Sequence, residues 1–333
     1  MGRRSTGLMK IVRVGALALC VQCVLMYAPV ALAQQPAAQP APQAAGRGRG
    51  PIPVDPRVQI RTYRFSDTSE DIPYAVFVSS KVRPDGKNPL VIALHGLGGT
   101  HTSLLRGNAL DLAEEGGYIL VGPMGYNPRG WYGVPATGRG GRGRGTGAPN
   151  PAAAPPANPG AARGAAPPQP AQATPGAPAR GRGAFADAND PPNLRELSEK
   201  DVMNVLSLVR QEFNVDERRI YLMGHSMGGA GTFHLAVKYA DKWAATASIA
   251  PAAFGMPPSS LAAIPNMPMM IVHGDMDTAV PVAVGRSWAE AMKELKMTHQ
   301  YIEVPGGDHG TVISTGMPDI FSFFGTHSKP APR

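Results

Sequence analysis

Cysteine is almost missing from this chain of 333 residues, which has only Cys20 and Cys23. Both lie in an N-terminal segment that we expect to be cleaved, so the mature protein is expected to contain none. This absence excludes disulfides as a source of stability, a thiol as the nucleophile and cysteine as a metal ligand. We expect the functional site to use no metal ion and no cofactor.

The N-terminus has the pattern of a secretory signal peptide. Four basic residues precede or begin an apolar run over residues 14–30, which ends in the small-x-small sequence Ala31-Leu32-Ala33. Residues 1–33 are therefore predicted to be removed on export to the periplasm or the extracellular space. The run is also long enough for an uncleaved membrane anchor, and this alternative stays open.

Large apolar side chains are missing from a long internal stretch. Residues 136–184 contain no Ile, Leu, Val, Met or aromatic residue, so nothing in them can pack into a core. We predict a low-complexity disordered insert over residues 134–190 and a disordered linker over residues 34–57. The remaining parts are a single foldable domain, made of residues 58–133 and 191–327, and a tail, 328–333.

Acidic residues are outnumbered by basic ones, 24 to 32, which gives a formal charge of +8. The basic excess lies in the signal peptide, the linker and the insert, and the foldable part carries about −2. The high pI therefore says nothing about the ligand of the site, and export argues against a nucleic acid partner. One alternative concerns the insert, whose Arg-Gly repeats would suit a binding module that attaches weakly to a cell surface or polyanion.

Alternating strand and helix patterns predict an α/β fold. Residues 59–65 and 72–80 are typical of two leading antiparallel strands, and the apolar run 89–94 is typical of a buried parallel strand. Ser198 and Asp201 resemble an N-cap and its third-position acid, followed by an apolar helical face. Further strands are expected at 118–121, 220–223, 244–249, 269–273 and 300–304, and helices at 104–115, 227–239, 283–295 and 319–324. The alternation implies a mostly parallel sheet with helices on both faces, whose ligands bind at the carboxyl ends of the strands.

The sequence Gly224-His225-Ser226-Met227-Gly228 follows the apolar run 220–223 and precedes a helical pattern. A serine at a sharp turn between a strand and a helix has a strained backbone, so its neighbours two residues away must be nearly free of side chains. Gly224 and Gly228 meet this demand. The positive end of the helix also favours a developing negative charge beside the serine. The pattern predicts Ser226 as a catalytic nucleophile.

Serine is a weak nucleophile at neutral pH and needs a base within reach, together with a group that orients the base. His309 is the best of eight histidines, because it lies in a glycine-rich loop between the last strand and the last helix. Asp277 follows the penultimate strand and gives the chain order Ser, Asp, His that such sites use. Asp275 stays an alternative acid, although we expect it to cap its turn, and Asp308 is expected to hold the loop of the base.

The other histidines are weaker candidates for the base. His95 and His273 end apolar strands and precede glycines, so we expect them to bind backbone groups in their turns. His225 adjoins Ser226, but side chains of adjacent residues diverge, so it is not expected to act as the base. The remaining four have no supporting context.

The attack of a serine on a carbonyl produces an oxyanion that needs backbone N–H donors held in place beforehand. The predicted donors are the N–H of Met227, after the nucleophile, and the N–H of Leu97, in the loop His95-Gly96-Leu97-Gly98-Gly99. Three aromatic residues near the start of the insert are expected to form a wall for the substrate: Tyr126, Trp131 and Tyr132.

These motifs together resemble the α/β-hydrolase superfamily, and within it the compact bacterial esterases related to feruloyl esterases, polyhydroxybutyrate depolymerases and prolyl-oligopeptidase-like hydrolases. The resemblance covers residues 58–327 without the insert. It implies a serine hydrolase of carboxylic esters, with a small-molecule or polymer-attached substrate and the triad Ser226, His309 and Asp277. The insert departs from the pattern and borders the expected substrate cleft.

A serine peptidase is the nearest rival, because prolyl-oligopeptidase-like enzymes share this catalytic domain. Those enzymes usually carry a large N-terminal β-propeller, and only a short linker follows the predicted signal peptide here. The segment 251–266, the only candidate for a cap over the site, is too short for a large helical lid. An open cleft with an esterase activity is therefore the expectation.

Overall fold

A computed structural model describes residues 53–136 and 189–331 of the protein. These residues fall within one unit of the chain, Pro53–Arg333. The predicted signal peptide, residues 34–52 of the linker and residues 137–188 of the insert lie outside the described residues.

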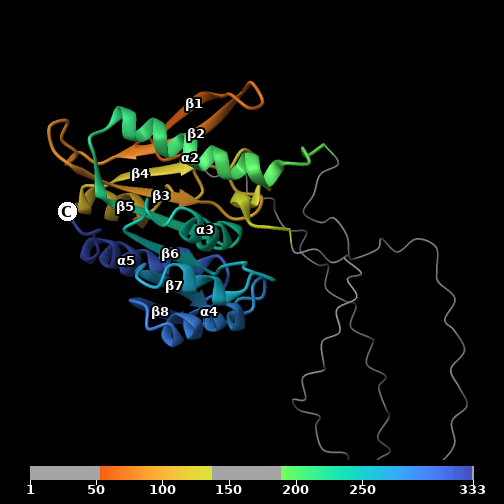
Figure 1. Ribbon diagram of the computed structural model, residues 1–333. Helices are drawn as coiled ribbons and strands as arrows, with labels where there is room; N and C mark the ends of the chain where they lie inside the picture. The colour runs from red at the N-terminus through yellow and green to blue at the C-terminus, as the bar shows by residue number, and fades with distance from the viewer. Residues whose placement is uncertain (1–52, 137–188, 332–333) are drawn as a thin grey trace, which may run out of the picture. The chain divides into compact units, whose positions relative to one another are not determined.

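The described strands form one sheet of eight, in the order β1-β2-β4-β3-β5-β6-β7-β8 (Figure 1). The leading strands β1 (Gln59–Phe65) and β2 (Glu70–Val78) are antiparallel to each other, and β2 is antiparallel to β4. Every other neighbouring pair is parallel. The remaining strands are β3 (Asn88–Leu94), β4 (Ile119–Pro123), β5 (Val215–His225), β6 (Ala245–Ile249), β7 (Met269–Gly274) and β8 (His299–Val304). The mostly parallel sheet with its antiparallel leading pair confirms the predicted fold class.

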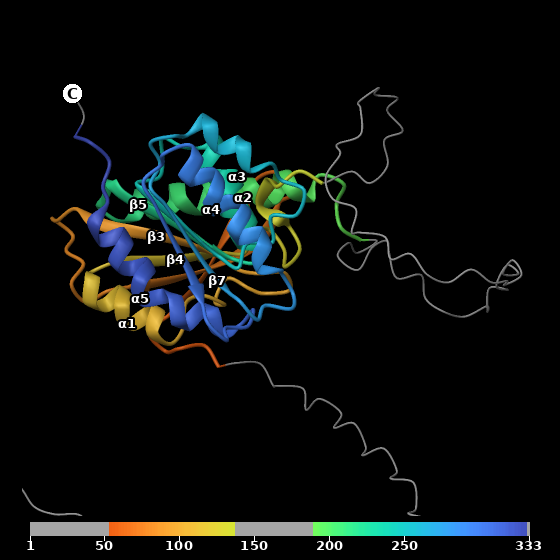
Figure 2. The same cartoon turned by 90° about the horizontal axis from the view of Figure 1, so that it is seen from below.

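Helices cover both faces of the sheet, as Figure 2 shows. On one face lie α1 (Asn108–Gly116) and α5 (Thr311–Thr326), which pack against each other. The other face carries α2 (Leu194–Glu212), α3 (Met227–Lys238) and α4 (Val282–Glu294). The central strands β3, β4, β6 and β7 are buried on both sides along their whole length. This is the pattern expected of parallel strands enclosed by helices.

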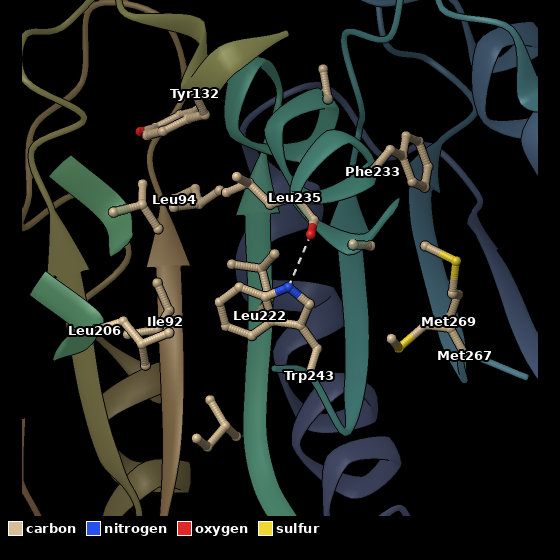
Figure 3. Close-up of a cluster of buried hydrophobic side chains, with 14 of the residues drawn as sticks. Ile92, Leu94, Tyr132, Leu206, Leu222, Phe233, Leu235, Trp243, Met267 and Met269 are labelled. Atoms are coloured by element: carbon tan, nitrogen blue, oxygen red, sulfur yellow. Dashed lines mark hydrogen bonds between the residues drawn. The ribbon is translucent and has the colours of Figure 1, made fainter. Parts of the chain in front are cut away.

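Two apolar cores hold the helices against the sheet. On the side of α3, the rings of Phe233 and Trp288 stack with their centroids 3.8 Å apart. The indole N–H of Trp243 donates to the carbonyl of Leu235 over 3.0 Å, so its polar atom is satisfied inside the core (Figure 3). Burying each such side chain stabilises the fold by roughly 1.5–3 kcal/mol. These cores give the strand ends that carry the site a rigid support.

The start of the helix after the insert differs from its prediction. Ser198 does not cap it, because α2 begins at Leu194 and Ser198 is a fully buried residue inside it. Its Oγ accepts the backbone N–H of Tyr132 over 3.0 Å. Asp201 is also buried, and it accepts the phenol of Tyr63 over 2.6 Å. Both polar residues face other segments of the chain, which a pattern of local capping cannot reveal.

The last helix is longer than the predicted 319–324. It begins at Thr311 and runs through Gly316 and Pro318, two residue types that disfavour helices. Gly316 is required by packing, since a Cβ there would lie 2.8 Å from Cγ1 of Val272 in β7. Close approach between helix and sheet therefore outweighs helix propensity at this point.

Candidate active site

Ser226 lies at the turn between β5 and α3, with φ 56° and ψ −114°. Its backbone N–H donates to the carbonyl of Ile249 over 2.9 Å, which ties the turn to the neighbouring strand β6. A Cβ on Gly224 would lie 2.2 Å from the carbonyl oxygen of Gly228, and a Cβ on Gly228 would lie 2.2 Å from that of Leu94. The tight turn therefore requires glycine at both positions, and Ser226 has the strained backbone that the sequence predicted.

Asp277 and His309 form a hydrogen-bonded pair at the same edge of the sheet. The Nδ1–H of His309, in the turn between β8 and α5, donates to Oδ2 of Asp277 over 2.7 Å. The other carboxylate oxygen accepts the N–H groups of Ala279 and Val280 over 2.9 and 2.8 Å. Burial alone raises the pKa of Asp277, but the bonds from Val280, His309 and Ala279 outweigh it and hold that pKa below its usual value. Asp277 is therefore a fixed negative charge against the imidazole.

The two rival aspartates hold the loop of His309 instead. Asp275 accepts the N–H of Gly306 over 2.7 Å. Asp308 accepts the N–H groups of Gly310 and Thr311 over 2.8 and 2.7 Å, as expected of a residue that shapes this loop. Neither carboxylate bonds to the His309 ring.

His225 brings the His309 loop beside the serine. Its Nε2 lies 2.8 Å from the backbone oxygen of His309, and the two rings lie 4.6 Å apart between centroids. Burial, together with the nearby His309, lowers the pKa of His225 to about 4. The sequence shows no signal for this contact, because His225 binds the backbone of a residue 84 positions away.

The loop after β3 passes close to Ser226. A Cβ on Gly96 would lie 3.3 Å from Cβ of Ser226, and Gly98, with φ 74°, donates its N–H to Pro128 over 2.9 Å. In the loops and caps of the described chain, the N–H groups of Leu97 and Met227 donate to no backbone carbonyl. Met227 is the first residue of α3, where the N–H has no partner within the helix.

Two buried histidines support this edge of the sheet, as predicted. The ring nitrogens of His95 lie 2.7 and 2.8 Å from the carbonyl oxygens of Gly96 and Met124, and burial lowers its pKa. His273, with no exposed surface, places Nε2 2.9 Å from the carbonyl oxygen of Val280 and 3.4 Å from the carboxylate of Asp277. Their rings therefore bind the turns that carry the candidate site.

The predicted aromatic wall requires a correction at Tyr132. Its side chain has no exposed surface, and its hydroxyl donates to the carbonyl of His95 over 3.2 Å, so it is a core residue beneath the site. Tyr126 and Trp131 are partly exposed. The hydroxyl of Tyr126 bonds to Glu70, and the guanidinium of Arg195 lies 5.4 Å from the ring centre of Trp131. A short apolar stretch before the insert does not distinguish packing from recognition, which explains the error.

Within residues 53–136 and 189–331, no cluster of three or more His, Asp or Glu residues could hold a metal ion. No helix in these ranges is long and apolar enough to cross a membrane.

The sheet order and the Ser226 turn are those of an α/β-hydrolase fold, as the motifs predicted. Residues 190–328 match the phospholipase/carboxylesterase family. A thermostable esterase structure superposes with a TM-score of 0.55 at 22% identity, over 82% of this chain and 64% of that one. The match at this level of identity shows the fold.

Two sequence relatives are named as an acetylxylan esterase/xylanase and as a cutinase. A bifunctional acetylxylan esterase/xylanase of Neocallimastix patriciarum is 39% identical over 77 residues, which are 23% of this chain and 11% of the relative. Cutinase 1 of Thermobifida cellulosilytica is 33% identical over 95 residues, 28% of this chain and 34% of the cutinase. The chain thus spans about a third or less of the curated relatives that it matches.

Proposed function

We propose that this protein is an exported serine hydrolase that cleaves carboxylic esters, with Ser226 as nucleophile, His309 as base and Asp277 as the orienting acid. The observation that carries the proposal is the Asp277–His309 bond of 2.7 Å beside a serine held at φ 56°. Strained backbone, an oriented imidazole and a fixed carboxylate are the parts that serine acyl transfer requires. The match to the phospholipase/carboxylesterase family supports the same chemistry.

The direction of the proton transfer follows from the hydrogen bonds of His309. Its Nδ1–H donates to Asp277, so Nε2 is the nitrogen left to accept the hydroxyl proton of Ser226. The serine oxygen then forms a bond to the acyl carbon, and the carbonyl oxygen becomes an oxyanion. His309 passes the proton to the leaving alcohol as the ester bond breaks. Water repeats the sequence on the acyl-enzyme, releasing the acid and restoring Ser226.

The proposed oxyanion donors are the N–H groups of Leu97 and Met227. Both come from turns that are fixed before the substrate arrives, one by the bond of Gly98 to Pro128 and the other by the start of α3. The loss of one such donor typically lowers kcat about 10²–10³-fold. The positive end of α3 adds to the same effect.

We propose a small-molecule or polymer-attached ester as the substrate. The segment between β6 and β7 contains only a short 3-10 helix, Pro258–Ala263, so the cover over the site is small. The acetylxylan esterase and cutinase relatives support a polymer-attached ester. Trp131 and Tyr126 remain the proposed substrate contacts on the side of the insert.

A panel of nitrophenyl esters, varied in acyl length and aromaticity, tests the activity beside the variant Ser226→Ala. Ser287→Ala is the matched control, because Ser287 is an exposed serine on α4 whose hydroxyl bonds only to the carbonyl of Val284. We expect wild type and Ser287→Ala to hydrolyse the esters and to be labelled at Ser226 by a fluorophosphonate. Retained activity or labelling in Ser226→Ala would overturn the proposal.

Export is tested separately by mass spectrometry of the N-terminus of protein recovered outside the cytoplasm. A mature chain that begins at Gln34 supports the proposed signal peptide. A protein that keeps Met1 and stays in the membrane fraction supports the anchor alternative instead.

A further inference from the structure

His225 contacts two segments of the proposed site besides the serine that follows it. Its Nε2 lies 2.8 Å from the backbone oxygen of His309. On its other side, a Cβ on Gly96 would lie 3.0 Å from Nδ1, so the loop that carries Leu97 passes directly over this ring nitrogen. One partly buried side chain thus lies between Ser226, the loop of His309 and the proposed oxyanion loop.

The hydrogen bond to His309 fixes the form of the His225 ring. A carbonyl oxygen only accepts, so Nε2 must carry the proton, and in a neutral ring Nδ1 is then unprotonated. Burial lowers the pKa of His225 most, and the charges of His309 and Arg106 lower it further. The hydrogen bond to the His309 carbonyl and the charge of Asp277 raise it, but by less, so the neutral ring is favoured. A neutral donor beside the base adds no charge that would oppose the proton uptake of His309.

The backbone of His309 needs such a partner. Its loop contains Gly306 with φ 69°, Gly307 and Gly310, so the chain itself has little stiffness there. The first turn of α5 leaves the His309 carbonyl free, because the N–H of Val312 bonds to Asp308 and that of Ile313 bonds to Gly310. Asp277 holds the imidazole of His309, and His225 holds its backbone.

We propose that His225 is a positioning residue for the proposed triad: by donating from Nε2 to the carbonyl of His309, it fixes the backbone from which the base reaches Ser226. The inference rests on the proposed role of His309. It adds a second anchor for the proposed base, which holds the backbone of His309 while Asp277 holds its ring.

Three variants separate the hydrogen bond from the packing of the ring. In His225→Gln, the amide N–H₂ stands at the same number of bonds from Cα as Nε2 and can still donate. In His225→Asn the amide is one bond too short to reach, and His225→Leu fills a similar volume without a donor. We expect the Gln variant to keep kcat within about twofold of wild type, and the Asn and Leu variants to lose about tenfold in kcat with KM unchanged. Equal activity of all three variants and wild type would overturn the proposal.

A double-mutant cycle with His309→Ala shows whether His225 acts through the base. If it does, His225→Leu lowers kcat in the wild-type background and leaves the residual activity of His309→Ala unchanged. A further loss of about tenfold in the His309→Ala background would mean that the ring acts on the serine or the oxyanion loop, which contradicts the proposal. If His309→Ala itself keeps full activity, the triad fails first, and this outcome is distinct from a failure of His225 alone.

The protonation state of the His225 ring can be measured in the wild-type protein, so this test does not depend on whether a variant folds. In ¹⁵N NMR spectra between pH 6 and 8 we expect the His225 imidazole to be neutral, with the proton on Nε2 and a bare Nδ1. A neutral ring with its proton on Nδ1 and a bare Nε2 would remove the hydrogen bond on which the proposal rests.

Discussion

Replacing Gly228 by alanine tests the steric argument for the serine turn. Its Cβ would lie 2.2 Å from the carbonyl oxygen of Leu94 and 2.8 Å from that of His95, and both are backbone atoms that cannot rotate away. Gly325 is a matched control in another helix, because the nearest atom to its Cβ would be the hydroxyl oxygen of Tyr118 at 3.9 Å. The same substitution therefore adds a methyl group where there is no space for it, at Gly228, and where there is space, at Gly325.

The two variants should differ in the sign of their effect on the free energy of unfolding. Alanine is favoured over glycine inside a helix by about 0.5–1 kcal/mol, and this gain applies at both positions. Overpacking typically costs about 1–3 kcal/mol, and it applies only at Gly228. We therefore expect Gly325→Ala to be more stable than wild type by up to about 1 kcal/mol, and Gly228→Ala to be less stable by about 1 kcal/mol, and by at most about 2.5 kcal/mol.

Urea unfolding followed by circular dichroism measures both values, provided that the slope with urea stays constant. Ester hydrolysis below the unfolding transition gives the second readout. Gly228→Ala should lose kcat/KM even while folded, because its methyl group pushes α3 away from the loop that carries Leu97. A Gly228→Ala variant with the stability and activity of wild type would refute the reasoning.

The remaining predictions concern hydrogen bonds around the site. Asp277→Asn should lower kcat about 10³–10⁴-fold with little change in KM: the Ala279 and Val280 N–H groups keep the amide oxygen, so the NH₂ faces Nδ1 of His309 and forces the wrong tautomer. Steady-state kinetics checks this, and a loss below tenfold would contradict it. Burial raises the pKa of Asp201 to about 6, despite bonds from Tyr63 and backbone N–H groups. The folded state therefore favours the neutral carboxyl of Asp201. Its contribution to the free energy of unfolding is complete below about pH 4, and about 3 kcal/mol of it is lost as the pH rises through about 6. Urea unfolding at pH 4 and pH 7 should show this loss relative to Asp201→Asn, and a pH-independent difference between the two proteins would exclude it. Tyr132→Phe should lower the unfolding free energy by about 1 kcal/mol, because the carbonyl of His95 loses its donor.

Local rules made much of the fold and the serine turn predictable. A glycine pair around Ser226 follows from sterics within one turn, and the buried strands follow from continuous apolar runs such as that of β3. The Asp277–His309 bond was expected from chain order and loop position, because parallel strands bring their carboxyl ends to one edge.

Contacts between distant segments could not be predicted in this way. Ser198 has the residue type of a helix cap, but it lies inside α2 because its hydroxyl is needed by the backbone of Tyr132. Tyr132 was expected at the substrate and is buried, since its neighbours in the core come from α2 and α3. In each case the contacting residues lie far away in the sequence. A serine can cap a helix or bind a distant backbone group, and a tyrosine can contact a substrate or fill a core, so the residue type alone does not decide between the roles.

The sheet order explains why the loop of the proposed base, His309, needs several anchors. Ser226 follows β5 and His309 follows β8, and with β6 and β7 between them the two strands are separated by about 14 Å, at roughly 4.8 Å per strand. The loop after β8 must therefore extend back across two strand ends to reach the serine. Its contacts follow that path: the N–H of Met276 bonds to the carbonyl of Gly307 over 3.0 Å, then Asp277 binds the His309 ring, and His225 binds its carbonyl. Because His225 belongs to β5 itself, it is the last of these contacts and the one that ties the loop to the strand of the proposed nucleophile.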